Sequence, residues 1–226
     1  MMEYLNKMTD AEYKIILVGD STVGKTSLFK KITSGKFMDK NVLTVGRDRK
    51  SFELEITVEE EGTQVQKKIT IFLEDTAGQE KYKAITKTYF KGSNGVLLLY
   101  NICDKKSFIN LRSWLDMAKE NIGNYEDNKY LVFLIGTKLD VAEQDDTKRE
   151  VTYEEASKFS EDNDIIFKGE FSSKESTDEN LKEIFVDFAT ELYYKVGFNK
   201  IERNTVSSLS KKKAKKNNSG NRHCGC

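Results

Sequence analysis

A glycine-rich run near the N-terminus has the most specific chemistry in the sequence. Residues 19–26 read GDSTVGKT, in which four residues separate two glycines and Lys25 and Thr26 follow the second. An apolar segment precedes the run and a helical pattern follows it, which is the context of a phosphate-binding P-loop. There, backbone amides at a helix N-terminus hold phosphate, Lys25 reaches the outer phosphates and Thr26 supplies a hydroxyl to Mg²⁺. The alternative is a glycine-rich turn that arose by chance.

A second group of polar residues follows a later apolar segment. Residues 75–80 read DTAGQE. An acid at a strand end can hold Mg²⁺ through water, so Asp75 is a candidate metal residue. Gly78 can give its amide to a terminal phosphate, and Gln79 lies where it can orient an attacking water.

Two further segments suggest which base is bound. Asp140, in the run TKLD at 137–140, can accept hydrogen bonds from the ring N–H and the exocyclic amine of guanine, a pair of donors that adenine lacks. In the run FSSK at 171–174, a backbone amide near Ser173 can face the guanine carbonyl. Taken singly, Asp140 and Ser173 are equally well read as ordinary polar loop residues. Their placement after successive strands favours guanine.

Alternating strand and helix patterns must position these groups. The expected strands are 13–18, 52–58, 69–73, 96–100, 131–135 and 165–167, and the expected helices are 25–33, 82–90, 108–121, 154–162 and 180–196. This alternation predicts an α/β fold, a mostly parallel six-stranded sheet with helices on both faces. Residues 59–62 join the second and third strands without a helix, which predicts one antiparallel hairpin at a sheet edge.

Composition excludes several classes of protein. The only histidine is His223, so Ser-His-Asp and Cys-His catalysis and His-ligated metals are ruled out for the folded body. The N-terminus has no signal-peptide pattern and no apolar run is long enough to span a membrane, which favours the cytosol. Residues 199–226 hold eight Lys or Arg and one Glu, a charge of +7 that leaves −7 on the rest. An acidic body argues against nucleic acid, and the basic tail suits an anionic membrane or a solvated end.

From about residue 13 to 196, with every nucleotide motif in order, the chain resembles the small GTPases. The resemblance implies Mg²⁺ as cofactor, GTP and GDP as ligands, Thr44 as the first-switch threonine that senses the γ-phosphate, and Phe37 as the aromatic that stacks on the base. It implies catalytic roles for Gln79, Lys25 and Thr44. The implied metal residues are Thr26, Thr44 and Asp75. The implied nucleotide contacts are Asp20, Ser21, Thr22, Val23, Gly24, Lys25, Thr26, Ser27, Phe37, Thr44, Gly78, Thr137, Lys138, Asp140, Ser172, Ser173 and Lys174.

Several segments resemble the Rab family in particular. They are residues 82–86, 89–93 and 99–108, together with Trp114 and the ending Cys224-Gly225-Cys226. In Rab proteins such an ending carries two geranylgeranyl groups, and the lysines at 211–216 would add attraction to an anionic membrane. The alternative for Cys224 and Cys226 is an exposed metal or redox pair. The expected organisation is an N-terminal extension at 1–12, a GTP-binding domain at 13–198 and a flexible tail at 199–226.

A Rab-like protein is expected to be a GTP/GDP switch in vesicle and membrane trafficking. The resemblance implies slow intrinsic hydrolysis, a GTPase-activating protein, an exchange factor, a GDP dissociation inhibitor and effectors. It also implies a monomer on the cytoplasmic face of an intracellular membrane, with a cytosolic pool. One alternative is a nucleotide-binding membrane adaptor with little hydrolysis, which Gln79 and Thr44 oppose. Another is a P-loop ATPase or kinase, which Asp140 opposes.

The chain departs from the family pattern at Thr22, where many Rab proteins have a small residue and a threonine should be tolerated, and at three further positions. Thr137 replaces an asparagine that braces the P-loop, and we expect guanine binding to survive. Arg49 and Glu74 replace two aromatic residues that join a tyrosine, here Tyr89, in the effector patch. The long stretch between Thr44 and Asp75 predicts an extended hairpin. Arg49 and Glu74 should face each other across it and form an exposed ion pair at the effector face.

Overall fold

Six strands form a single mixed sheet in the order β2-β3-β1-β4-β5-β6. The computed structural model describes residues 9–34, 47–76, 88–122 and 130–197. The strands are β1 (Ala11–Val18), β2 (Arg47–Glu60), β3 (Thr63–Thr76), β4 (Gly95–Asn101), β5 (Leu131–Thr137) and β6 (Ile166–Phe171). Only the β2–β3 pair at the edge is antiparallel, and the other four neighbouring pairs are parallel. The predicted fold class is confirmed.

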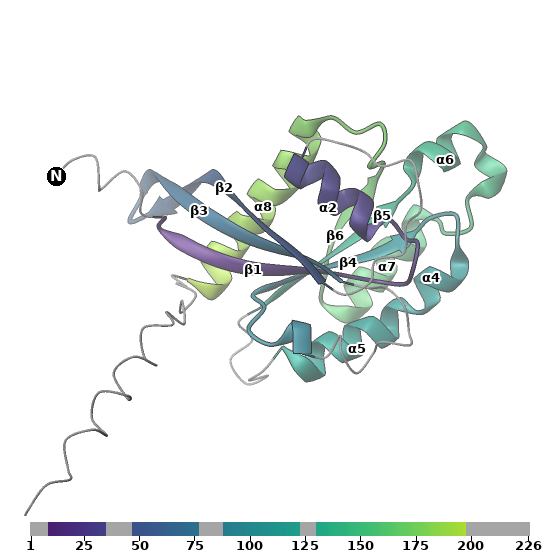
Figure 1. Ribbon diagram of the computed structural model, residues 1–226, viewed down its shortest axis with the longest axis horizontal. Coiled ribbons are helices and arrows are strands. Elements are labelled where there is room, and N and C mark those ends of the chain that lie inside the picture. Colours follow the sequence, from purple (N-terminus) through teal and green to yellow (C-terminus); the bar gives the residue numbers. More distant parts are fainter. Residues whose placement is uncertain (1–8, 35–46, 77–87, 123–129, 198–226) are drawn as a thin grey trace, which may run out of the picture.

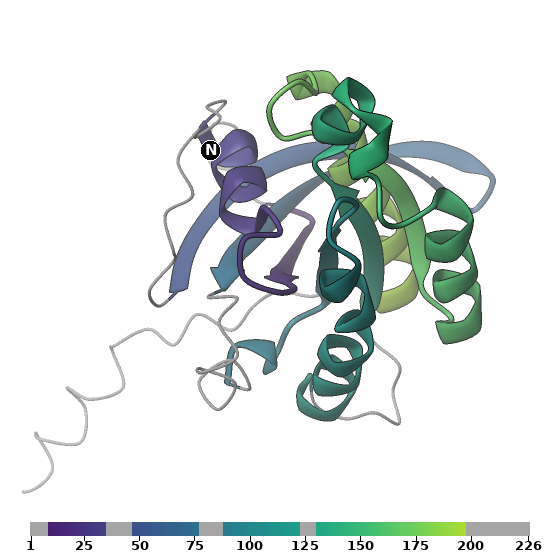
Figure 2. The same cartoon turned by 90° about the vertical axis from the view of Figure 1, so that its right-hand side faces the viewer.

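Helices cover both faces of this sheet (Figures 1 and 2). They are α2 (Lys25–Ser34), α4 (Lys105–Ile109), α5 (Leu111–Asn121), α6 (Leu139–Gln144), the 3-10 helix η3 (Asp146–Lys148), α7 (Tyr153–Asn163) and α8 (Asp178–Val196). Apolar side chains of α2 and α8 pack with those of the sheet in one buried cluster, and those of α5 and α7 pack in a second. Because the parallel strands all end at one edge, the loops that follow β1, β3 and β5 meet there.

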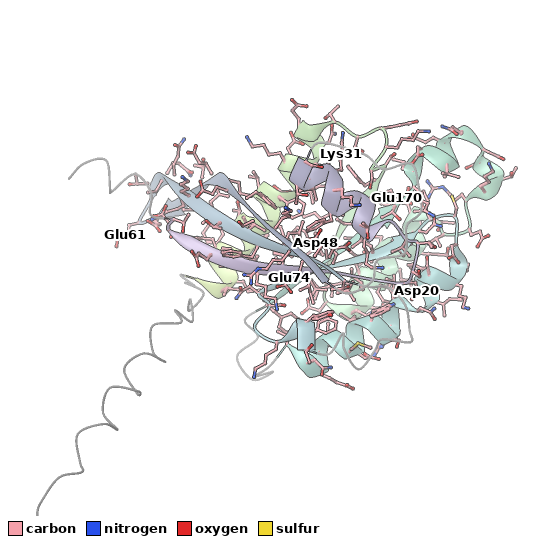
Figure 3. All side chains as sticks on the ribbon, in the orientation of Figure 1. Asp20, Lys31, Asp48, Glu61, Glu74 and Glu170 are labelled. Atoms are coloured by element: carbon pink, nitrogen blue, oxygen red, sulfur yellow. The ribbon has the colours of Figure 1, made fainter. Side chains whose placement is uncertain are left out.

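The hairpin of β2 and β3 is longer than its apolar segments predict. Its two strands have 14 residues each, and the pairing runs unbroken from Arg47 opposite Thr76 to Glu60 opposite Thr63. Glu61 and Gly62 form the turn with φ values of 52° and 77°, as a two-residue hairpin turn of the mirror-image type requires. The extended hairpin is therefore confirmed. Glu61 at its tip lies at the opposite end of the sheet from Asp20 (Figure 3).

The tip of the hairpin is attached to the end of α8. The Tyr193 hydroxyl donates a hydrogen bond to the Glu60 carboxylate, and the Glu59 amide donates to the Tyr194 hydroxyl at 2.8 Å. Lys67 forms an ion pair with Glu60 at 2.8 Å. These contacts explain how a long edge hairpin can stay on the body of the protein.

The helix expected at 108–121 divides into two. Asp104 caps α4 by accepting hydrogen bonds from the amides of Lys106 and Ser107, so helical structure begins before the predicted start. Asn110 ends α4 and begins α5. The sequence pattern also missed α6 and η3, which are too short for a clear apolar period. Most of the helix expected at 82–90 lies outside the described residues. The part that is described, residues 88–90, is helical.

Candidate nucleotide-binding site

The predicted P-loop lies between the end of β1 and the start of α2. Gly19 has a φ of 145°, and a Cβ there would lie 2.2 Å from the Leu99 carbonyl oxygen, so only glycine fits. Thr22 and Gly24 also have positive φ values, 64° and 103°. Such a backbone turns successive amides toward one point, the arrangement that binds an anion.

Lys25 lies at the centre of this loop. It is 5% exposed, and its Nζ donates to the carbonyl oxygens of Gly19 at 2.9 Å and Asp20 at 2.5 Å. Burial lowers the pKa of Lys25 to about 8, although the carboxylates of Asp75 and Asp20 oppose this shift. An anion bound beside the ammonium group would raise that pKa again. The environment of Lys25 therefore suits a phosphate ligand.

Thr26 and Asp75 come together from α2 and β3. The Thr26 hydroxyl donates to Asp75 Oδ2 at 2.6 Å. Asp75 is 1% exposed, and its Oδ1 has no hydrogen-bond partner among the described residues. Burial raises the pKa of the Asp75 carboxyl, which hydrogen bonding from Thr26 and the charge of Lys25 partly offset.

These two side chains fit a magnesium ion. In the described part of the chain, no three His, Cys, Asp or Glu side chains gather as a metal cage. Mg²⁺ does not require one, because it keeps several waters and binds through one or two protein oxygens plus substrate phosphates. The buried Oδ1 of Asp75 and the Thr26 hydroxyl are oxygens of this kind. With bound phosphate, they could hold Mg²⁺ and let it neutralise phosphate charge.

The candidate base-recognition residues also converge. Asp140 is 9% exposed and accepts a hydrogen bond from the Ser172 hydroxyl at 2.8 Å, which joins the loop after β5 to the loop after β6. The Ser172 hydroxyl in turn accepts from the amides of Lys174 and Glu175 at 3.2 and 3.1 Å. Lys138 holds a left-handed φ of 65° immediately before α6. Ser172 thereby orients the carboxylate proposed to read guanine.

Thr137 braces the P-loop although it replaces the asparagine of the family pattern. Its hydroxyl is 2.5 Å from the Val23 carbonyl oxygen and 2.7 Å from that of Tyr100. A threonine hydroxyl has one proton, so it donates to one of these oxygens at a time. Val23 belongs to the P-loop, so a direct contact between this loop and the end of β5 is retained.

Arg49 and Glu74 form the predicted cross-strand ion pair. They face each other in the β2–β3 register, and Arg49 Nε is 3.7 Å from Glu74 Oε1. The predicted exposure is wrong for one partner: the side chain of Glu74 is 1% exposed, while that of Arg49 is 40% exposed. The Arg49 guanidinium also lies over the Phe72 ring, 4.5 Å from its centre.

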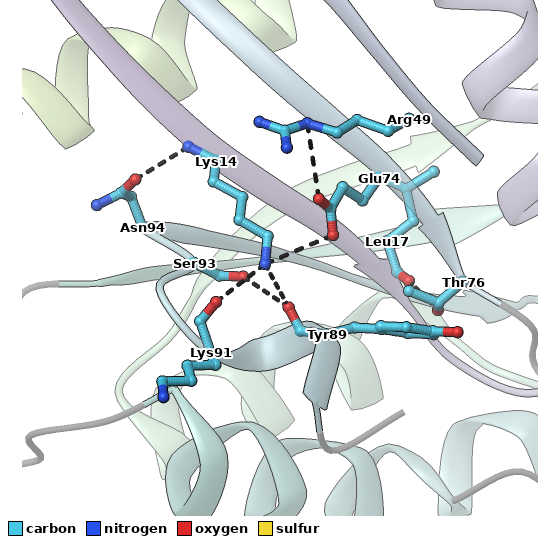
Figure 4. Close-up of polar contacts among 9 residues, drawn as sticks. All are labelled: Lys14, Leu17, Arg49, Glu74, Thr76, Tyr89, Lys91, Ser93 and Asn94. Atoms are coloured by element: carbon cyan, nitrogen blue, oxygen red, sulfur yellow. Dashed lines mark hydrogen bonds and ion pairs between the residues drawn. The ribbon is translucent and has the colours of Figure 1, made fainter. Parts of the chain in front are cut away.

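Lys14 is a second cation beside the buried Glu74 carboxylate. Its Nζ is 3.5 Å from Glu74 Oε2 and donates to the carbonyl oxygens of Tyr89 at 2.6 Å and Lys91 at 3.0 Å (Figure 4). Sequence reasoning missed this residue. Its signal was a lysine inside the otherwise apolar segment 13–18. Through Lys14, the backbone of Tyr89 joins Arg49 and Glu74.

Six predicted site residues lie outside the described residues: Phe37, Thr44, Gly78, Gln79, Cys224 and Cys226. Among the others, the structure brings together the P-loop, Asp75, Thr137, Asp140 and Ser172. The Asp20 side chain points elsewhere, because Asn110 and Trp114 hold its carboxylate.

The fold and the site define a P-loop protein of the small-GTPase class. The family model described as Ras family matches residues 14–194. The chain is 36% identical over 200 residues to Ras-related protein Rab-30 of Homo sapiens, which covers 88% of this chain and 89% of that protein. It is 34% identical over 198 residues to Ras-related protein Rab-13 of Bos taurus, covering 88% of each chain. Ras-related protein rab-39 of Caenorhabditis elegans is 34% identical over 185 residues, covering 82% of this chain and 75% of that protein.

The chain therefore belongs to the Ras family, and it is a Rab-like small GTPase of the kind that acts in membrane trafficking. Guanine-nucleotide binding and GTP hydrolysis are the general activities of this family. Within the ranges that the structure describes, no helix is both long and apolar enough to cross a bilayer.

Proposed function

We propose that this protein is a membrane-bound switch that binds Mg²⁺ with GTP or GDP and hydrolyses GTP slowly until a GTPase-activating protein accelerates the reaction. The observation that carries the proposal is the meeting of three strand ends, where Lys25 follows β1, Asp75 lies next to the last residue of β3 and Asp140 follows β5. These groups match the phosphate, the metal and the base of one ligand. The GTP-binding domain would span residues 13–198.

Each residue has a specific role in this proposal. Lys25 and the P-loop amides stabilise charge on the phosphates, while Thr26, Thr44 and Asp75 hold the metal. Gln79 orients the attacking water, and Thr44 and Gly78 respond to the γ-phosphate. Loss of that phosphate on hydrolysis would release both switch segments and their effectors. Phe37 stacks on the base that Asp140 reads.

The tail supplies the attachment to the membrane. Geranylgeranyl groups on Cys224 and Cys226 would give stable binding, because one lipid chain alone binds only marginally. The lysines at 211–216 add attraction to an anionic cytoplasmic leaflet. A GDP dissociation inhibitor would maintain the cytosolic pool. Replacing both cysteines with serine should leave a folded protein that no longer sediments with membranes, and continued sedimentation would refute this attachment.

The effector face is the part of the proposal most particular to this chain. Glu74 is buried, so a partner would meet the half-exposed Arg49 over Phe72 rather than an exposed ion pair. A cationic group at this position disfavours an apolar effector helix and favours a partner that offers an acidic or polar side chain. The protein is expected to be a monomer when it binds exchange factors and effectors.

Single-turnover hydrolysis tests the proposed activity. The purified protein is loaded with γ-labelled GTP, and phosphate release is followed after addition of Mg²⁺, beside a Gln79→Leu control loaded in the same way. Slow release that the control lacks supports a GTPase. Retention of intact GTP by the wild type, with and without cell extract as a source of activating protein, would favour the nucleotide-binding adaptor instead.

A further inference from the structure

Two side chains outside the P-loop donate hydrogen bonds to the carboxylate of Asp20. Its Oδ1 accepts a hydrogen bond from Trp114 Nε1 at 2.6 Å, and its Oδ2 accepts one from Asn110 Nδ2 at 2.6 Å. The two donors are four residues apart at the start of α5, so they lie on the same side of the helix. Both oxygens of one carboxylate are thus bound by one rigid element.

The side-chain hydrogen bonds to Asp20 are not part of the helix's own hydrogen bonding. Asn110 occupies the N-cap position of α5, but its side chain makes no capping hydrogen bond there. Trp114 is 3% exposed and packs in the apolar cluster with Leu111 and Leu115. A buried indole N–H needs an acceptor, and here that acceptor is Asp20.

Asp20 lies in the P-loop, so the hydrogen bonds that hold its side chain affect phosphate binding. A carboxylate in a phosphate-binding loop repels an anionic ligand, unless it is turned away and its charge is compensated. The backbone of the same residue belongs to the phosphate-binding machinery, because its carbonyl oxygen accepts from Lys25 Nζ at 2.5 Å. The side chain of Asp20 therefore attaches to α5 while its backbone positions Lys25.

We propose that Asn110 and Trp114 are positioning residues that fix the P-loop in its nucleotide-retaining conformation by holding Asp20 on α5. The inference rests on the proposed function and adds to it a link between α5 and nucleotide release. When this link is broken, the Asp20 carboxylate moves toward the phosphates and Lys25 loses its fixed carbonyl acceptor. Bound GDP then leaves faster.

The test measures the release rate of a fluorescent methylanthraniloyl-GDP from the full chain in Mg²⁺, after addition of excess GDP. The variants are Trp114→Phe, which keeps the ring and removes the N–H, Asn110→Ala, Asp20→Ala, and Asp20→Ala combined with Trp114→Phe. Leu115→Ala, alone and combined with Asp20→Ala, is the matched control, because Leu115 is fully buried on the same helix and its aliphatic side chain cannot donate a hydrogen bond to Asp20. Melting temperatures are measured in parallel, and Asp20→Asn replaces Asp20→Ala if the latter does not fold.

We expect Trp114→Phe and Asn110→Ala each to release GDP about tenfold faster, the factor typical of losing one charge-assisted hydrogen bond. Asp20→Ala should release GDP less rapidly than these two variants, because it has no carboxylate to approach the phosphates. The double variant should be no faster than Asp20→Ala alone, because both changes break the same contact. Leu115→Ala should lower the melting temperature, and any effect it has on release should multiply that of Asp20→Ala. Release rates of Trp114→Phe and Asn110→Ala within twofold of the wild type, or effects that multiply in the double variant, would overturn the inference. A wild type that does not bind the GDP analogue would instead refute the proposed function.

Discussion

Arg49 and Glu74 face each other across the β2–β3 pair, with Arg49 Nε 3.7 Å from Glu74 Oε1. The pair is asymmetric, because Glu74 is buried and also lies 3.5 Å from Lys14. Two cations therefore hold one carboxylate, and Arg49 is the more exposed of the two, at 40% against 12% for Lys14. Exchanging the two charges would place an arginine against Lys14, so that exchange would disturb folding and could not test partner choice alone.

Lys14 is expected to contribute more to stability than Arg49. Lys14→Met should lower the free energy of unfolding by about 3–5 kcal/mol, because it leaves a buried carboxylate with one partly exposed partner. Lys14→Met combined with Glu74→Leu should recover most of that loss. Urea unfolding monitored by circular dichroism measures the free energy of unfolding of the single and the double variant.

Arg49→Ala is the matched control for this network. Arg49 is 40% exposed, so its removal should cost about 1 kcal/mol or less. A larger loss from Arg49→Ala than from Lys14→Met would show that the exposed arginine, not the lysine, compensates the buried carboxylate.

Thr137 should influence how long nucleotide stays bound. Thr137→Val keeps the shape of the side chain and removes the hydroxyl that contacts the Val23 carbonyl oxygen. A lost hydrogen bond of about 1 kcal/mol predicts release of fluorescent GDP about fivefold faster than in the wild type. Thr137→Asn restores the residue of the family pattern and should release nucleotide at close to the wild-type rate. An unchanged rate in Thr137→Val would show that this brace does not act on nucleotide retention.

The alternation of strands and helices could be predicted from the sequence, because buried parallel strands are continuous apolar runs. The P-loop could be predicted because it requires glycine at fixed positions. The extension of the hairpin followed from the long stretch between Thr44 and Asp75, but the bounds of its strands did not, since its outer face is polar and β2 and β3 are held by pairing and by Tyr193 and Tyr194 of α8. The ion pair between Arg49 and Glu74 followed from counting residues on either side of the nucleotide motifs. The burial of Glu74 did not, because Lys14 is 60 residues away in the sequence.

Chelation of Mg²⁺ should accelerate nucleotide release through Asp75. In the wild type, EDTA removes the metal that Thr26 and Asp75 are proposed to hold, and GDP release should rise at least about tenfold, the effect of losing roughly 1.4 kcal/mol of binding. Asp75→Ala should release GDP rapidly with or without EDTA. If EDTA still accelerates release from Asp75→Ala as strongly as from the wild type, Asp75 does not take part in holding the metal.

The hairpin tip should loosen in acid. Hydrogen bonds from Lys67 and then Tyr193 lower the pKa of Glu60 below its usual value. Its contribution to stability is therefore present above the unfolded pKa of about 4.3 and is lost as the pH falls through the folded pKa. Hydrogen-exchange protection of the amides at 63–67 should fall between about pH 6 and pH 3 in the wild type. Glu60→Gln should remove most of this pH dependence, and an equal fall in both proteins would assign it to another group.

The most direct test of the account is an exchange of base specificity at Asp140. Asp140→Asn replaces a carboxylate that accepts two hydrogen bonds with an amide that can also donate, while Ser172 remains as a neighbour. The affinities of GDP and xanthosine diphosphate are measured for both proteins by competition against fluorescent GDP or its xanthine analogue. We predict that the variant loses about 1–3 kcal/mol of affinity for GDP and gains affinity for the xanthine nucleotide, whose exocyclic oxygen accepts. Unchanged GDP affinity with no gain for xanthine would contradict recognition of guanine by Asp140.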